Sequence, residues 1–409
     1  MDYRIERLRA GDYDELLAMM NRVFRKPEGN TFDIFLPVMW ERDDERMSKH
    51  LAIRADGKIA AVVGIYPLPA VVAGIPVAFS TIGNVATLPE YEGRGMMKRL
   101  MTEAVREAKE TGLEVARLSG ARQRYNRYGF DKAGVDHLFR LRPKNLLDFY
   151  GGKKLESGET VYAGSPFSGG VGFERALTFR QVGPDDGDLL YRVMELQKQS
   201  EIYALRGDAK QFFKTLSAYK SKILAAIDRK GDVTGYLCAS ESGADIVEHR
   251  AGTPFDAYRM ICEWLLCSGV GELTVRTASF ETELNRLLGR ICESWTTSEP
   301  SMFNPLRWEN LLRGLLKIKA KYTAVPETEL TLKIEGDGIF TFRGAECRET
   351  DNAPDLALSH LDAVRFLLGS LPAQSVADIA DADGLTQDQK LYIQSVFPLP
   401  LWWCNQDRV

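Results

Sequence analysis

The sequence predicts an α+β protein built from three successive parts. Strand patterns of period two and amphipathic helices are interspersed along the chain, which is typical of sheets packed against helices. The order of strands and helices over residues 176–295 repeats the order over residues 2–141. From about Met302 the pattern changes to a long amphipathic helix, a hairpin and three further helical stretches. These observations predict two parts of similar fold and a third part of a different fold.

The composition predicts a multidomain globular protein. At roughly 100 to 200 residues per domain, 409 residues correspond to two to four domains. Hydrophobic residues make up 44% of the chain and charged residues 27%, as in ordinary soluble proteins. The net charge of −4 argues against nonspecific nucleic-acid binding, which needs a basic surface. Nucleic acid is therefore not an expected partner.

The remaining bulk features favour a cytoplasmic protein. The N-terminus lacks the apolar core of a signal peptide, and no stretch approaches the roughly 18 apolar residues of a membrane span. The six cysteines are scattered and form no CxxC pair, so we expect reduced thiols. The four histidines show no local metal-ligand spacing. We expect a cytoplasmic location, no membrane span and no metal site.

The first part reads as a sheet with helices on its faces. Asp12 begins a segment with apolar residues at helical spacing, and Asp56-Gly57 is a turn between two strands. Gly83-Asn84 interrupts a strand midway, which predicts a bulge or a close backbone approach. The predicted strands cover residues 2–8, 50–72, 74–88, 113–120 and 130–141, with helices at 12–24 and 96–111 and a short turn or helix at 122–126.

The strongest local signal is the turn Gly93-Arg94-Gly95, which an amphipathic helix follows at once and which Gly112 closes at the far end. The first N–H groups of a helix lack intrahelical partners, and glycines let an anion approach them closely. Arg94 adds a cation at the same place. The turn can therefore bind a pyrophosphate, but the same residues also fit an ordinary helix start. The apolar stripe of the helix consists of Met96, Met97, Leu100, Met101, Ala104, Val105 and Ala108.

A segment rich in glycine and serine, residues 150–172, predicts a linker before the second part. The second part contains no Gly-Arg-Gly turn. Its predicted strands cover residues 176–182, 222–228, 232–240 and 272–278, and its predicted helices 185–200, 257–269 and 281–295. For the third part we expect helices at 305–322, 360–371, 375–382 and 386–397 and a hairpin at 329–344.

A second motif gives the glycine turn a functional meaning. Tyr125-Asn126-Arg127-Tyr128-Gly129-Phe130 follows the turn, the helix and a strand. This ordered set resembles the GCN5-related N-acetyltransferases, in which the turn holds the pyrophosphate of acetyl-CoA. The resemblance implies mixed, largely antiparallel central sheets and a pantetheine arm lying between strands 77–88 and 113–119. The family pattern Gln/Arg-x-x-Gly-x-Gly/Ala is met with two departures, Glu92 and Met97.

The layout of the whole chain resembles the Eis (enhanced intracellular survival) family. The resemblance implies an acetyltransferase domain with the acetyl-CoA site at residues 1–150 and a second acetyltransferase-like domain without it at 151–301. It also implies a sterol-carrier-like domain at 302–409, for which the strand and helix of residues 347–370 are the counterpart. A homo-oligomer and a tail that reaches the active site are further implications, and Trp402 and Trp403 would anchor that tail by burial.

The resemblance also implies the roles of individual residues. Tyr125 would protonate the leaving thiolate, the backbone N–H of Val85 would polarise the thioester carbonyl, and the α-carboxylate of Val409 would act as base. Asp407 is an alternative carboxylate. The implied acetyl-CoA contacts are Val85, Thr87, Glu92, Gly93, Arg94, Gly95, Met96, Met97, Ser119 and Asn126.

The predicted function is transfer of an acetyl group to a primary amine, and the acceptor stays open. The resemblance implies an aminoglycoside, a polyamine or a protein lysine. Candidates for the acceptor pocket, chosen by position alone, are Phe24, Glu28 and Asp33, and Arg122, Gln123 and Arg124 could line the site. The alternative is a non-catalytic acyl-CoA or lipid binding module. Aminoacyl transfer from tRNA is a third reading, which the acidic composition disfavours.

Overall fold

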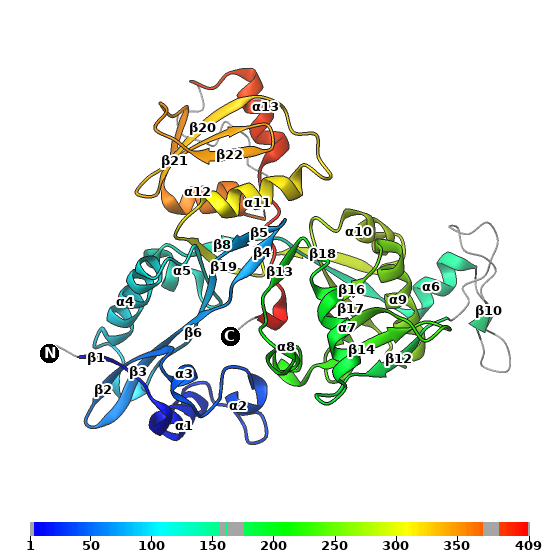
Figure 1. Ribbon diagram of the computed structural model, residues 1–409, viewed down its shortest axis with the longest axis horizontal. Helices are drawn as coiled ribbons and strands as arrows, with labels where there is room; N and C mark the ends of the chain where they lie inside the picture. Colours follow the sequence, from blue (N-terminus) through cyan, green and yellow to red (C-terminus); the bar gives the residue numbers. More distant parts are fainter. Residues whose placement is uncertain (1–3, 152, 155–159, 162–175, 371–383, 408–409) are drawn as a thin grey trace.

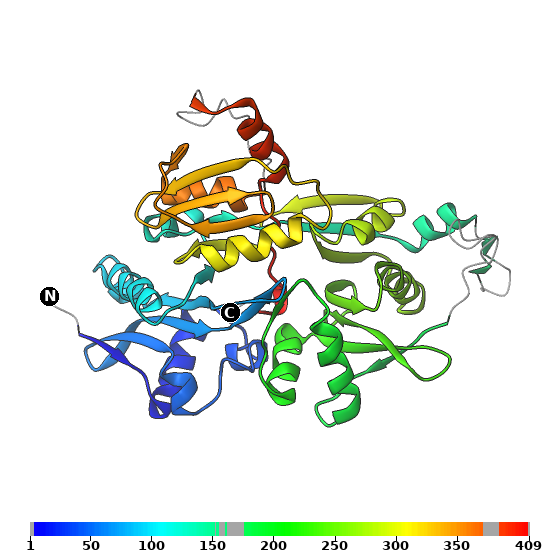
Figure 2. The same cartoon turned by 45° about the horizontal axis from the view of Figure 1, so that its top comes forward.

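The structure is a computed structural model that describes residues 4–151, 153–154, 160–161, 176–370 and 384–407. Two seven-stranded sheets lie side by side, one mainly blue and cyan and the other mainly green (Figure 1). A smaller, four-stranded sheet drawn in orange lies above the first sheet and its junction with the second, and a second view shows the same arrangement (Figure 2). The predicted mixed α+β architecture is confirmed.

The first sheet has the strand order β1-β2-β3-β6-β7-β19-β8. Its pairs are antiparallel except β6 with β7. The turn between β2 and β3 lies at Asp56 and Gly57, which both have positive φ, as predicted. The strands are β1 Ile5–Arg7, β2 His50–Ala55, β3 Lys58–Pro67, β6 Phe79–Thr87, β7 Val115–Leu118, β19 Ser301–Pro305 and β8 Asp131–Ala133.

Helices cover the faces of the first sheet. The longest is α4, Met96–Glu110, and its predicted apolar stripe is turned inward: five of the seven residues are buried and two are half-buried. Gly112 follows it with φ 81°, as expected for a helix C-terminus. The shorter helices α2 and α3 were not predicted. The others are α1 Tyr13–Val23, α2 Phe32–Phe35, α3 Asp44–Met47 and α5 Arg122–Tyr125, with 3₁₀ turns at Ala10–Asp12, Pro89–Tyr91 and Asn126–Tyr128.

The second sheet has the order β12-β14-β15-β16-β17-β9-β18. The predicted helix 281–295 is too long, because α10 ends at Gly289 and residues 294–298 pair with β9 instead. Strand β16 and helices α6 and α8 were not predicted. The strands are β12 Thr178–Gln181, β14 Lys222–Ile227, β15 Val233–Ala239, β16 Asp245–Ala251, β17 Leu273–Ala278, β9 Asp136–Leu141 and β18 Ser294–Ser298. The helices are α6 Pro143–Tyr150, α7 Gly187–Gln197, α8 Ala209–Leu216, α9 Pro254–Cys267 and α10 Thr282–Gly289, with a 3₁₀ turn at Ala218–Lys220.

The first sheet is completed by a strand that follows the second sheet in sequence. Residues 130–141, predicted as one strand, form β8 in the first sheet and β9 in the second, separated by Gly134 with φ 79°. Strand β19 inserts between β7 and β8 of the first sheet, although it follows the second sheet in sequence. The first sheet therefore contains a strand that follows the whole second sheet in sequence, and the chain passes between the two sheets twice, at Gly134 and between β18 and β19.

The third sheet has the order β22-β21-β20-β23 and lies against α11, Glu309–Lys319. The predicted hairpin forms between β20 and β21, and helix α11 starts later than predicted because residues 301–305 are strand β19. The predicted helix 375–382 and most of the predicted linker 150–172 lie outside the described residues. The remaining elements are β20 Glu329–Ile334, β21 Gly338–Arg343, β22 Glu346–Glu349, β23 Leu356–Leu358, α12 His360–Leu368, α13 Gln387–Val396 and the pair β10 Lys153–Lys154 and β11 Thr160–Val161.

A single apolar core joins the third sheet to the chain end. It includes the fully buried Trp308, the small sheet β13-β4-β5 and the two tryptophans of the tail, Trp402 and Trp403. Both are buried, so their predicted anchoring of the tail is confirmed. The small sheet comprises β13 Ile202–Ala204, β4 Ala70–Val72 and β5 Ile75–Val77. Among the described residues, no helix combines the length and apolar character of a membrane span.

Candidate active site

The first sheet opens between β6 and β7. The two strands pair in parallel only from Phe79 with Val115 to Thr81 with Arg117. Beyond that point β6 runs on to Thr87 beside β3, whereas β7 pairs with β19 on its other side. The strands therefore diverge, and among the described residues no strand pairs with the edge of β6 from Ile82 to Thr87 on the β7 side. This divergence is where the sequence predicted that a pantetheine arm would lie.

Strand β6 carries a bulge at the same place. Val62 pairs with Ala86 and Gly64 with Gly83, so β6 contains one more residue than β3 between these pairs. The bulge predicted from Gly83-Asn84 is confirmed, but Asn84 and not the glycine takes the left-handed conformation, with φ 52°. Val85, the predicted donor to the thioester carbonyl, follows directly. The bulge therefore turns the backbone at the residue proposed to use its N–H.

The glycine turn is open to solvent at the start of α4. Gly93 and Gly95 have φ 75° and 77°, and a Cβ built on either would meet no atom within 4 Å. The helix has no side-chain N-cap. Within the described part of the chain, the N–H groups of residues 93–98 donate to no acceptor. Several unpartnered donors at a helix N-terminus attract an anion, and the missing Cβ atoms leave room for it.

Cations surround this turn. Nη2 of Arg94 donates to the carbonyl of Glu90 at 3.1 Å, and the guanidinium lies 5.0 Å from the centre of the Tyr91 ring. Arg94 is thus held at the turn but stays exposed. An open depression beside α4 is lined by Ile5, Gly95, Lys98, Arg99, Thr102 and Glu103, so two cations and one carboxylate face it. Glu92, which replaces the family's Gln or Arg, is also exposed.

Tyr125 lies at the end of α5, next to the opening between the strands. Its ring packs over Gly120, where an added Cβ would come within 2.8 Å of the tyrosine Cε2. Burial raises the pKa of Tyr125, and the neighbouring Arg124 opposes this increase. The phenol is therefore neutral and able to donate at physiological pH. Gly120 is accordingly required for this placement of the ring.

The loop after Tyr125 is held by helix α12 and strand β19. Gly129 ends this loop with φ 88°, and its carbonyl oxygen lies 3.0 Å from Nε2 of His360. Nδ1 of His360 contacts the carboxylate of Asp337. The amide of Asn304 on β19 donates to the carbonyl of Tyr128 at 2.8 Å. Elements far apart in sequence therefore fix the loop that carries Tyr125.

The other predicted acetyl-CoA contacts lie around the same opening. Thr87 ends β6, and Met96 and Met97 begin α4. Ser119 follows β7 and is exposed, with Arg117 Nη2 3.5 Å from its hydroxyl. Asn126 uses its amide nitrogen to donate to the carbonyl of Phe130 at 2.8 Å, which closes the Tyr125–Phe130 loop.

The predicted acceptor residues are more scattered. Phe24 and Glu28 are exposed, and Phe24 contacts the ring of Phe32. Asp33 is half-buried, and its Oδ1 is buried without a hydrogen-bond partner among the described residues. Arg122 does not point to a free ligand surface, because it forms an ion pair with the buried Asp131. Gln123 and Arg124 are exposed.

The tail reaches the point where β6 and β7 part. Arg117, in the last β6–β7 pair, donates from Nη1 to the carbonyl of Asp407 at 3.1 Å. The Asp407 carboxylate is bound by Arg206, from Nε at 2.8 Å and from Nη2 at 2.9 Å. Val409, the predicted base, lies outside the described residues. The described tail thus ends beside the opening, and its last carboxylate is engaged by an arginine.

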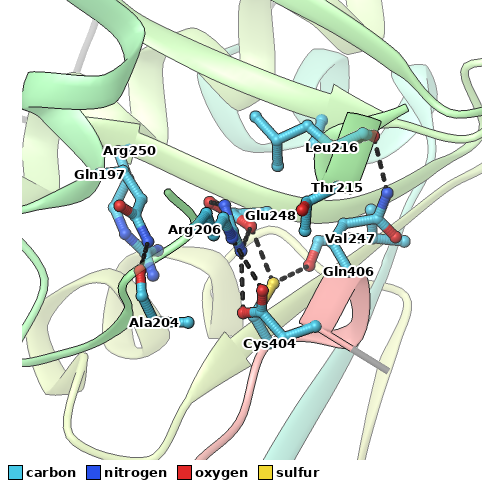
Figure 3. Close-up of polar contacts among 12 residues, drawn as sticks. Gln197, Ala204, Arg206, Thr215, Leu216, Val247, Glu248, Arg250, Cys404 and Gln406 are labelled. Carbon is cyan, nitrogen blue, oxygen red and sulfur yellow. Dashed lines mark hydrogen bonds and ion pairs between the residues drawn. The ribbon is translucent and has the colours of Figure 1, made fainter. Parts of the chain in front are cut away.

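Arg206 bridges two buried carboxylates (Figure 3). It binds Glu248 on β16 at 3.0 and 2.6 Å in addition to Asp407. Glu248 also accepts from the hydroxyl of Tyr236 and, at 2.8 Å, from the thiol of Cys404. Burial opposes ionisation, but Arg206 outweighs it and lowers the pKa of Glu248 to about 2. For Asp407, burial and then the charge of Glu248 raise the pKa despite Arg206. The cluster holds the tail against the second sheet. No short sequence motif predicted it.

Sequence reasoning also missed a buried polar group at the bulge, formed by His50, Tyr66 and Asn84. Tyr66 Oη lies 2.7 Å from His50 Nε2, and Asn84 Nδ2 lies 2.5 Å from Tyr66 Oη. These residues are on three different strands and share no sequence spacing. The interruption at Gly83-Asn84 was the one signal that pointed to this place.

His50 makes the stability of the protein depend on pH. Burial lowers its pKa to about 4, against 6.5 for an exposed imidazole. The unfolded chain therefore takes up a proton at higher pH than the folded protein, so stability is lost as the pH falls from about 6.5 towards 4. We expect about 2 kcal/mol less unfolding free energy at pH 5 than at pH 7.5 from this residue. Urea titrations of the wild type and His50→Gln at both pH values check this, and equal pH slopes would contradict it.

Comparison with known proteins agrees with this geometry. Residues 4–133 match the family described as an acetyltransferase (GNAT) domain. The matched segment runs from β1 to β8 of the first sheet. None of the curated protein sequences matches the chain. Among the described residues, no cluster of three or more His, Cys, Asp or Glu side chains could hold a metal ion.

Solved structures share the fold over nearly the whole chain. A probable N-acyltransferase from Enterococcus faecalis V583 superimposes with a TM-score of 0.69 at 16% identity, covering 98% of both chains. A GCN5-related N-acetyltransferase from Anabaena variabilis ATCC 29413 gives 0.65 at 14%, also over 98% of both chains. Eis1 from Mycobacterium abscessus gives 0.64 at 13% over 100% of both. The likeness in fold thus extends well beyond the first sheet.

Proposed function

We propose that the chain is an acetyl-CoA-dependent N-acetyltransferase that acetylates a primary amine. The observation that carries the proposal is the divergence of β6 and β7 beside a glycine turn whose N–H groups are open. The turn suits a pyrophosphate, and the opening suits an extended arm that ends at the bulge. Both lie in the segment that matches the acetyltransferase domain.

In this proposal the residues of the chain divide three tasks. The N–H groups of residues 93–97, with Arg94 beside them, hold the pyrophosphate. The backbone N–H of Val85 polarises the thioester carbonyl while the amine nitrogen attacks its carbon. As the carbon–sulfur bond breaks, the hydroxyl of Tyr125 donates to the sulfur. A phenol is a weaker acid than a thiol, so a hydrogen bond to sulfur contributes more than complete proton transfer.

The base that accepts the amine proton remains a prediction. The α-carboxylate of Val409 is the proposed group. Asp407, the alternative, binds Arg206 through both carboxylate oxygens. Because an arginine binds both of its oxygens, this carboxylate is better suited to holding the tail in position than to accepting a proton. The sterol-carrier-like nature of residues 302–409 and the homo-oligomer also remain predictions.

The acceptor is proposed to be an aminoglycoside-, polyamine- or lysine-like amine. These acceptor classes follow from the resemblance of the chain layout to the Eis family, and the fold shared with Eis1 supports that resemblance. The half-buried Asp33, whose Oδ1 has no hydrogen-bond partner among the described residues, lies on α2 next to Phe32, in the region predicted for the pocket. The ring of Phe32 contacts the rings of Phe24 and Trp40. A carboxylate next to aromatic rings favours a cationic acceptor.

The test is release of free CoA thiol from acetyl-CoA with a panel of aminoglycosides, polyamines and lysine peptides. We expect amine-dependent release and an acetylated product of 42 Da greater mass, the increment of replacing one amine hydrogen by acetyl. Thermal stabilisation by CoA without turnover on any amine would instead favour the alternative, a non-catalytic acyl-CoA binding module. Absence of any CoA binding would overturn both.

Gly95→Ala should weaken acetyl-CoA binding at least tenfold, because its Cβ would stand where the phosphate approaches the backbone. Gly112→Ala is the matched control: it lies at the other end of α4, has φ 81° against 77°, and has no atom within 4 Å of an added Cβ. Both changes should cost about 1–2 kcal/mol of stability from the left-handed backbone. Calorimetric titration with acetyl-CoA checks the difference, and equal affinities would remove the turn from the site.

A further inference from the structure

The polar group at the bulge is a built network within an apolar core. His50 is fully buried, Tyr66 and Asn84 are each 7% exposed, and apolar side chains of the first sheet surround them. Besides its bond to Tyr66, Asn84 Nδ2 lies 3.1 Å from His50 Nε2. Burying three polar side chains costs free energy unless each finds a partner, and here each of the three does.

The hydrogen bonds run in one direction. Nδ1 of His50 lies 3.1 Å from the carbonyl of Met47, and a carbonyl can only accept, so Nδ1 carries the proton. In the neutral ring Nε2 is then an acceptor, and the hydroxyl of Tyr66 donates to it. Asn84 in turn donates from Nδ2 to the oxygen of Tyr66. The histidine therefore determines which way the Asn84 amide is turned.

Glycine makes room for this arrangement. His50 pairs with Gly64 across β2 and β3, and Gly64 pairs with Gly83 across β3 and β6. A Cβ on Gly64 would lie 2.3 Å from the hydroxyl oxygen of Tyr66, so the tyrosine crosses the sheet over this glycine. Tyr66 thus reaches His50 at one end of this row and Asn84, the residue after Gly83, at the other.

The network ends on the backbone of the bulge. Asn84 has φ 52°, a conformation that a side chain usually disfavours and that its local hydrogen bonds can stabilise. The residue after it is Val85, on the part of β6 with which no described strand pairs on the β7 side. A rotation of Asn84 would change the direction of the following N–H.

We propose that His50 and Tyr66 are positioning residues that hold Asn84 in its left-handed conformation and thereby orient the Val85 N–H towards the thioester carbonyl. The inference rests on the proposed function and assigns it two residues that do not touch acetyl-CoA. The network supplies no proton to the reaction. It keeps a backbone donor in place before the substrate arrives, so its loss should slow the chemical step more than it weakens binding.

The experiment compares four variants in the CoA-release assay. Tyr66→Phe and His50→Leu should lower kcat at least tenfold and leave the KM for acetyl-CoA within about threefold. His50→Gln, in contrast to His50→Leu, should keep kcat within about threefold of wild type, because its amide retains one donor and one acceptor. Tyr392→Phe is the control, since it removes a buried hydroxyl bond, to the carbonyl of Gly344 at 2.7 Å, far from the bulge. Wild-type kcat in Tyr66→Phe would overturn the inference.

A second measurement does not need turnover. In protein labelled with ¹⁵N-valine, the amide proton of Val85 should shift when the ketone analogue of acetyl-CoA, with CH₂ in place of the thioester sulfur, replaces CoA. We expect the shift to be at least halved in Tyr66→Phe. An undiminished shift would overturn the positioning role even if no amine is acetylated, a result that would itself refute the proposed function. Failure of the analogue to bind would overturn both.

Discussion

Arg206→Met should lower the free energy of unfolding by about 3–5 kcal/mol, the usual cost of removing one partner from a buried ion pair. The side chains of Arg206, Glu248 and Asp407 are 1%, 1% and 3% exposed. Methionine has a similar length but no charge, so both carboxylates would stay buried without their cation. Urea denaturation followed by fluorescence, which the buried tail tryptophans report, measures the change.

Arg106→Met is the matched control. Arg106 also contacts two carboxylates, Glu103 and Glu110, but its side chain is 53% exposed. Water solvates these charges when the arginine is lost, so we expect only a small fraction of the loss seen in Arg206→Met. A similar loss in both variants would show that burial does not determine the strength of the Arg206 contacts.

The same cluster allows a rescue experiment. Adding Glu248→Gln and Asp407→Asn to Arg206→Met removes both unpaired charges, and we expect at least half of the lost stability to return. The pH dependence gives an independent check. Because the pKa of Glu248 is about 2 in the folded protein, it contributes stability above about pH 4.5 that is lost as the pH falls towards 2. Arg206→Met should remove this contribution.

Sequence analysis predicted the features that residues close together in the chain determine. The Gly93-Arg94-Gly95 turn, the inward stripe of α4 and its closure at Gly112 all follow from residues within one helix. The bulge was also visible as an interruption of a strand. In each case the signal is either a regular apolar period or a local interruption of one. A single segment of the chain contains the whole signal.

Such local patterns could not predict which strands pair in the folded protein. Residues 130–141 alternate like one strand, and only their partners, β19 for β8 and β17 and β18 for β9, separate them into two sheets. The buried contacts of the site are similar, since Arg206, Glu248 and Asp407 meet across 201 and 42 residues of sequence. A charged residue in a sequence carries no mark of being buried, so its partner cannot be inferred from spacing.

Tyr125→Phe should lower kcat about 100-fold and leave the affinity for acetyl-CoA within about threefold, because it removes only the proposed donor to the leaving sulfur. The ring that packs over Gly120 is kept, so the loop should retain its position. Since burial raises the pKa of Tyr125, the wild type should show no loss of rate from this group up to about pH 10. Steady-state rates across pH 6–9.5 check both statements.

Tyr128→Phe separates donation from packing. Tyr128 lies three residues further on the same loop, and burial raises its pKa as well, but its carbonyl and not its hydroxyl contacts Asn304. We expect its kcat to stay within about twofold of wild type. Full activity in Tyr125→Phe would leave the leaving sulfur to be protonated by solvent, whereas equal losses in both variants would assign the effect to the loop that His360 and Asn304 hold. A loss confined to Tyr125→Phe would require the hydroxyl itself, since the two variants share the loop and differ in which phenol is removed.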